Sequence, residues 1–102
     1  MIIYSVTVSI DNSIQADWLQ WMQEVHIPDV MSTGMFMDSH IHRLLDPPPH
    51  DPDSSTYNIQ YTCATMADYV AHQERFAPQL QKDHTDRYKD KFVAFRTLLE
   101  RI

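Results

Sequence analysis

The sequence is poor in glycine, cysteine and basic residues. Its single glycine excludes the glycine-rich loops that cradle nucleotide phosphates. The lone Cys63 cannot close an internal disulfide, so we expect a reducing compartment, and its place in an apolar segment favours a buried, inert thiol over a nucleophile. Acidic residues outnumber basic ones by 14 to 8, and the basic residues are scattered. This charge disfavours nucleic acid or an anionic membrane as a partner.

The chain also lacks long apolar runs. No stretch reaches the length of a membrane-spanning helix, and the first residues, MIIYSVTVSID, lack the positive start and apolar core of a signal peptide. We therefore expect a cytoplasmic protein without a membrane partner. Its 102 residues, of which 43% are hydrophobic, are expected to fold as one domain.

Alternation and helical spacing predict the elements of the first half. Residues 2–10 alternate between apolar and mostly small polar side chains, which is typical of a half-buried strand. A helix follows, with Trp18 in its apolar stripe. Pro28 must kink this helix or restart it, because proline has no N–H and collides with the carbonyl four residues earlier. Gly34 occupies the place of a left-handed C-cap, and a second strand is expected over about residues 35–45.

The second half repeats this order. Residues 46–55 form a loop rich in proline and aspartate, and residues 57–63 alternate again as a strand. A helix begins after Thr65, and Pro78 must kink it or restart it after Ala77, as Pro28 does in the first helix. After a polar stretch, the apolar residues 91–100 form the last strand. The order strand–helix–strand–strand–helix–strand predicts an α+β, ferredoxin-like βαββαβ fold, with a four-stranded antiparallel sheet and two helices on one face.

The sheet face without helices is expected to be of mixed character. It carries small polar side chains from the first and third strands, namely Ser5, Thr7, Ser9, Asn58, Gln60 and Thr62. In the last strand we assign Val93, Phe95, Thr97 and Leu99 to the helices, and Phe92, Ala94, Arg96 and Leu98 to the bare face. Such a face is too apolar for full exposure and too polar for a dry core. Pairing two copies across a twofold axis would enclose a wet interior, so we predict a homodimeric α/β barrel.

Three sets of residues are candidates for ligand binding in that interior. Arg96 could bind an anionic group, together with His40 and His42, whose rings point the same way along the second strand. The alternative interpretation is that both histidines are exposed to solvent. No metal site is predicted, because no further ligands accompany them. Trp18 could line a pocket, although aromatic residues at helical spacing usually belong to a core.

His26 is the candidate catalytic residue. It lies near the end of a helix with Glu24 and Asp29 close in sequence, and it could act as a general base. Its alternative role is structural, with the ring donating to a backbone carbonyl that Pro28 releases.

Several segments resemble one protein family. The segments MIIYSVTVSID, WLQWMQEVHIPDV, YNIQYT, FAPQL and FVAFRTLLE, spread over nearly the whole chain, are similar to the bacterial family DUF4286, a domain of unknown function. The resemblance implies a ferredoxin-like domain related to the dimeric α/β barrels, a group with small monooxygenases, degradation enzymes and haem-binding members. It supplies no reaction, because the family carries no assigned activity. In the wider group a helix histidine is sometimes functional, and His26 is the position that could match.

Two functions are consistent with these observations. The first is a homodimer whose interior binds a small polar or anionic molecule; an enzyme of this kind would use His26, or His40 and His42, with Arg96 orienting the substrate. The alternative is a non-enzymatic structural or regulatory dimer that acts through protein contacts of the loop 46–55. No cofactor is predicted, and haem binding through His26 is a weaker third hypothesis.

Overall fold

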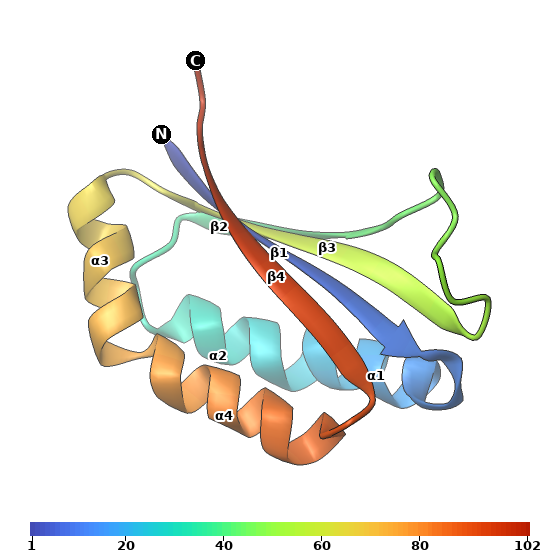
Figure 1. Ribbon diagram of the computed structural model, residues 1–102. Helices are drawn as coiled ribbons and strands as arrows, with labels where there is room; N and C mark the ends of the chain where they lie inside the picture. Colours follow the sequence, from blue (N-terminus) through green and yellow to red (C-terminus); the bar gives the residue numbers. More distant parts are fainter.

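The computed structural model describes all residues, 1–102, and consists of one sheet with helices packed on one of its faces (Figure 1). The strands are β1 (Ile2–Asp11), β2 (Asp38–Arg43), β3 (Ser54–Cys63) and β4 (Phe92–Glu100), all antiparallel to their neighbours, in the order β2–β3–β1–β4. The helices are α1 (Gln15–Trp21), α2 (Ile27–Ser32), α3 (Met66–Arg75) and α4 (Ala77–Tyr88). None of them combines the length and apolar character that a membrane crossing needs. The predicted α+β class and four-stranded antiparallel sheet are confirmed.

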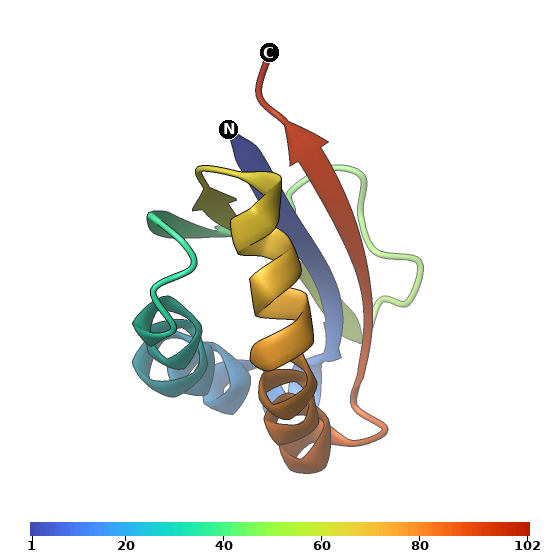
Figure 2. The same cartoon turned by 90° about the vertical axis from the view of Figure 1, so that its left-hand side faces the viewer.

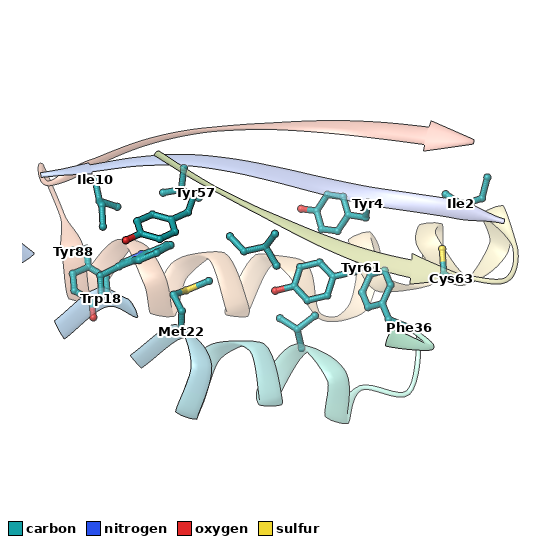
Figure 3. Close-up of a cluster of buried hydrophobic side chains, with 13 residues drawn as sticks. Ile2, Tyr4, Ile10, Trp18, Met22, Phe36, Tyr57, Tyr61, Cys63 and Tyr88 are labelled. Carbon is teal, nitrogen blue, oxygen red and sulfur yellow. The ribbon is translucent and has the colours of Figure 1, made fainter. Parts of the chain in front are cut away.

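The core lies between the sheet and the helices. Alternate residues of the two central strands point into it and are buried: Ile2, Tyr4, Val8, Ile10, Tyr57, Ile59, Tyr61 and Cys63. Figure 3 shows Trp18 near Tyr57 and Tyr88 at one end of this core, and Phe36 at the other. Cys63 is buried as predicted, and burial raises the pKa of its thiol.

The first helical segment changes its winding before Pro28. α1 passes into a π-helical turn, Met22–His26, in which the Ile27 N–H donates to the Met22 carbonyl, and α2 then starts with Pro28 in its first turn. Because proline cannot donate to the carbonyl four residues earlier, the wider turn accommodates the missing hydrogen bond. The restart predicted at Pro28 is confirmed, and Gly34 has the positive φ, 78°, of a left-handed C-cap.

Pro78 marks the boundary between α3 and α4. α3 begins after Thr65, whose hydroxyl accepts a hydrogen bond of 3.2 Å from the Asp68 N–H. α4 follows with Pro78 in its first turn. The restart predicted at Pro78 is confirmed, and α4 continues for 12 residues, a length that the sequence analysis did not assign. Its extent was not predicted, because its buried residues are Ala77, His84 and Tyr88, which do not form an apolar stripe.

The second strand is shorter than predicted. It covers Asp38–Arg43 instead of residues 35–45. Single hydrogen bonds extend its pairing at either end, from the Met37 N–H to the Thr62 carbonyl and from the Leu44 N–H to the Thr56 carbonyl. The prolines that follow have no N–H, so the ladder cannot continue into the loop.

The predicted face assignment of β4 is wrong. Phe92 lies opposite Ile10 of β1, so the side facing the helices consists of Phe92, Ala94, Arg96 and Leu98. The bare face carries Val93, Phe95, Thr97 and Leu99 instead, and Val93 and Phe95 are 73% and 60% exposed. Both sets of alternate residues in β4 are largely apolar, so only the register of β4 against β1 determines which side chains face the helices.

The bare face is polar at its centre and apolar along β4. On the central strands, the Asn58 side-chain amide donates to the hydroxyls of Ser5 and Thr7, at 2.8 and 3.1 Å. Figure 2 shows that the helices leave this side of the sheet uncovered. The predicted mixture of polar and apolar residues is therefore present, with different residues of β4 supplying the apolar part.

Candidate functional site

A cavity of about 50 Å³ lies between the sheet and the helices. Of its 16 lining residues 11 are hydrophobic, and the others are His26, His72, Gln81, His84 and Arg96. They come from the π-helical turn, α3, α4 and β4. A pocket with apolar walls, a few convergent polar groups and several imidazoles is the usual form of a small-molecule site.

His84 lines the cavity, and a hydrogen bond to its ring defines the tautomer. The Trp18 indole N–H donates to His84 Nε2 at 2.9 Å, and both residues are buried. An indole nitrogen can only donate, so His84 Nε2 must be an acceptor and the ring proton is on Nδ1. Burial lowers the pKa of His84 to about 4, and repulsion from His26 and Arg96 acts in the same direction.

His26 lies across from His84 on the π-helical turn. Its ring stacks on Trp21 with centroids 5.1 Å apart, and its centroid is 5.8 Å from that of His84. Burial lowers the pKa of His26, against the opposing influence of Asp29 and Asp83. The ring makes no hydrogen bond to a backbone carbonyl, so the structural role considered for His26 is not observed. Its ring instead lines the cavity, where burial disfavours the protonated form.

Arg96 reaches this cavity because β4 has the register described above. It lies opposite Val6 and on the same side of the sheet as His26 and His84. Its guanidinium takes part in neither of the two ion pairs of the protein, Lys82–Asp86 and Arg87–Asp17. Arg96 is exposed, so this cation without a protein counter-ion lies at the edge of the cavity.

His40 and His42 lie on the opposite side of the sheet from Arg96. They are opposite Gln60 and Asn58 of β3, on the bare face, with ring centroids 6.3 Å apart. The joint site predicted for Arg96 and these histidines is therefore wrong, because the sheet separates them. The chain has no group of three or more His, Cys, Asp or Glu side chains that could hold a metal ion.

Trp18 belongs to the core and also contacts a residue that lines the cavity. Its side chain is fully buried and packs on Tyr57, with ring centroids 5.0 Å apart, while its N–H orients His84. His72 and His84 were not predicted as site residues, because neither belongs to an apolar stripe in the sequence. The spacing of Leu80, His84 and Tyr88 at every fourth residue was the available signal.

A four-stranded antiparallel sheet with one helical layer and a histidine-lined cavity defines a small α+β domain of ferredoxin-like architecture. The chain belongs to the family described as Domain of unknown function (DUF4286), whose model matches residues 1–102. The resemblance identified from the sequence is thereby confirmed. No curated protein matches the sequence.

Several solved structures share this fold at low sequence identity. A dimeric ferredoxin-like protein from an uncultured marine organism has a TM-score of 0.73 and 11% identity, covering 100% of this chain and 95% of that chain. An ethyl tert-butyl ether d (ethd) family protein from Bacillus halodurans has a TM-score of 0.67 and 11% identity, with 100% of both chains covered. A candidate antibiotic biosynthesis monooxygenase from Nitrosomonas europaea has a TM-score of 0.66 and 16% identity, covering 100% and 99%. At these identities the likeness establishes the fold alone.

Proposed function

We propose that this protein is a homodimer that binds a small organic anion, such as a carboxylate, in the cavity between its sheet and its helices. The observation that carries the proposal is the unpaired guanidinium of Arg96 at the edge of an otherwise apolar, histidine-lined cavity. A carboxylate accepts two parallel hydrogen bonds from a guanidinium and neutralises its charge. The cavity is far smaller than the roughly 300–1,000 Å³ of pockets for drug-sized ligands, which favours a small molecule.

The apolar walls and the histidines restrict the ligand further. Tyr4, Val8 and Leu80 supply surfaces for a hydrocarbon or aromatic part, and no carboxylate of the protein lines the cavity. The carboxylates of Asp29 and Asp83 act on His26 from outside this lining. This location replaces the interior between two sheets that the sequence analysis favoured, and it retains His26 and Arg96 as the proposed site residues.

The homodimer is supported by a separate set of observations. Val93, Phe95 and Leu99 are exposed on the bare face, and such a patch is rarely left to solvent. Proteins described as dimeric and ferredoxin-like share the fold. In the proposed dimer the bare faces pack together, and the sheet–helix cavity of each copy remains separate from that interface.

Ligand-induced thermal stabilisation tests the binding proposal. The wild-type protein is titrated with propionate, butyrate, succinate and benzoate, and with the corresponding uncharged amides, while Tm is recorded. A carboxylate present at about 100 times its Kd should add about 2.7 kcal/mol to the free energy of unfolding, and the amides should add much less.

The matched pair of variants is Arg96→Gln and Arg101→Gln. Both remove one positive charge from an exposed arginine, but Arg101 lies at the end of the chain and does not line the cavity. Arg101→Gln should keep the response to carboxylates and Arg96→Gln should lose it. If no carboxylate stabilises the wild type, the binding proposal fails and the non-enzymatic dimer acting through loop 46–55 is favoured.

A further inference from the structure

We propose that His84 is a permanently uncharged hydrogen-bond donor to the ligand, and that Trp18 is the positioning residue that makes it so. The ligand class that fits is a small oxo acid, with its carboxylate at Arg96 and its carbonyl oxygen at His84 Nδ1. This inference rests on the proposed binding of an anion in the cavity and specifies the second group that the ligand carries.

The first step is the direction of the Trp18–His84 hydrogen bond. The two side chains come from α1 and α4, 66 residues apart, and meet at 2.9 Å in a buried environment. If the His84 proton were on Nε2, two N–H groups would face each other without solvent, and the indole would lose its partner. The contact therefore selects the tautomer with the proton on Nδ1.

The second step is the availability of His84 Nδ1. This atom makes no hydrogen bond within the protein and is not among the fully enclosed polar atoms without a partner, which are His72 Nδ1 and Gln73 Nε2. His84 is only 8% exposed and lines the cavity. His84 Nδ1 is therefore a donor without an acceptor in the protein, on a residue that lines the cavity.

The third step is the absence of a group that would charge the ring. Across the cavity the charged or titratable neighbours of His84 are His26 on the π-helical turn and Arg96 on β4, and both disfavour a second proton on the ring. The remaining ring contacts are aromatic, with Phe92 at 4.4 Å, Tyr88 at 5.5 Å and Trp21 at 5.9 Å between centroids. A donor of this kind stays in the same state over the physiological pH range.

In the proposed complex, Arg96 and His84 bind different groups of an oxo acid. The guanidinium binds charge, which a carboxylate supplies, whereas a neutral imidazole N–H selects an acceptor oxygen. A simple aliphatic acid satisfies Arg96 but leaves the His84 N–H unpaired.

The first test measures the tautomer without any ligand. In ¹⁵N-labelled protein, long-range ¹H–¹⁵N correlation of the imidazoles should show His84 with a protonated Nδ1 and a bare Nε2 between pH 6 and 8. Trp18→Phe removes the donor and should shift His84 toward the other tautomer. Trp21→Phe is the matched control, because Trp21 contacts the same ring without a hydrogen bond to it. A wild-type His84 with its proton on Nε2, or in exchange between tautomers, overturns the inference.

The second test measures the ligand preference by calorimetric titration. 2-Oxobutyrate and 4-oxopentanoate are compared with butyrate and pentanoate, and at least one oxo acid should bind about tenfold more tightly than its deoxo counterpart. This preference should persist in Trp21→Phe and disappear in Trp18→Phe, while the affinity for the simple acid is kept. If simple and oxo acids bind equally well, the inference is wrong although the proposed function stands. If no acid binds, the proposed function has failed and the ligand assignment with it.

Discussion

The surroundings of His26, His72 and His84 in this cavity disfavour the charged form of each ring. Burial lowers the pKa of each ring, and Arg96 lowers the pKa of His26 and of His84 further by repulsion. The positive charge of the cavity is therefore carried by Arg96 alone. An anion that enters meets one fixed cation and several neutral groups that can donate or accept a hydrogen bond.

The low pKa of His84 should make the protein less stable at acidic pH. The pKa of this ring is about 4 in the folded protein and 6.5 in the unfolded chain, so the unfolded chain binds more protons between these values. The free energy of unfolding should therefore decrease as the pH falls through this window, by on the order of 3 kcal/mol from this residue. Urea denaturation at a series of pH values measures the decrease.

His84→Gln is the variant that isolates this effect. Its amide oxygen can still accept the Trp18 N–H, but the side chain does not titrate. The pH dependence of stability should become shallower by about the contribution of His84, whereas His50→Gln in the exposed loop should change nothing. An unchanged slope in His84→Gln would contradict the low pKa.

Individual site residues could be predicted only where their chemistry was visible locally. His26 stood out because it lies two residues before a proline in a helix, and the structure places it at the cavity. Arg96 was chosen as an anion-binding residue but assigned to the wrong face. His84 could not be identified, because a histidine on a polar stretch looks solvated until its helix is oriented and Trp18, 66 residues away, is brought to it.

At the scale of elements, proline and glycine were the most reliable signals. Pro28, Pro78 and Gly34 act through the backbone, so their effects hold whatever packs around them. β4 and α4 depend on tertiary packing instead. The side of β4 that faces the helices is set by its pairing with β1, and α4 is held by contacts of polar and aromatic residues.

Gly34→Ala should destabilise the protein through the backbone alone. Gly34 has a φ of 78°, and a Cβ added there would meet no atom within 4 Å, so no steric clash with neighbouring residues contributes. The free energy of unfolding should decrease by about 1 kcal/mol, which is the cost of placing alanine in the left-handed region. This loss lowers the Tm of a domain of this size by about 4–8 °C. Thermal and urea denaturation both report this loss.

Two further variants control for the backbone explanation. Gly34→Asn should cost less than Gly34→Ala, because asparagine tolerates the left-handed region better. Asp90 is the one non-glycine residue with positive φ, 66°, so Asp90→Gly should leave stability within about 0.5 kcal/mol of wild type. A Gly34→Ala protein as stable as wild type would exclude the predicted strain.

At the scale of the whole molecule, the two faces of the sheet have different roles. The side covered by helices holds the core and the cavity with Arg96, and the bare side holds a polar centre beside the apolar edge of β4. The polar centre of the bare face could be predicted from the alternation of β1 and β3. The location of the cavity could not be predicted, because it depends on which alternate residues of β4 face the helices.

Phe95→Glu should dissociate the proposed homodimer. Phe95 is 60% exposed on the bare face, so a carboxylate there costs an isolated subunit little, but a dimer through this face would bury two such charges without partners. The dissociation constant should rise by about 100-fold or more, which sedimentation equilibrium and light scattering can measure. Leu45→Glu is the matched control, because Leu45 is 85% exposed outside the sheet and should leave the assembly intact. A wild-type protein that sediments as a monomer at every concentration would refute the dimer and leave the binding cavity, which one chain forms alone, unaffected.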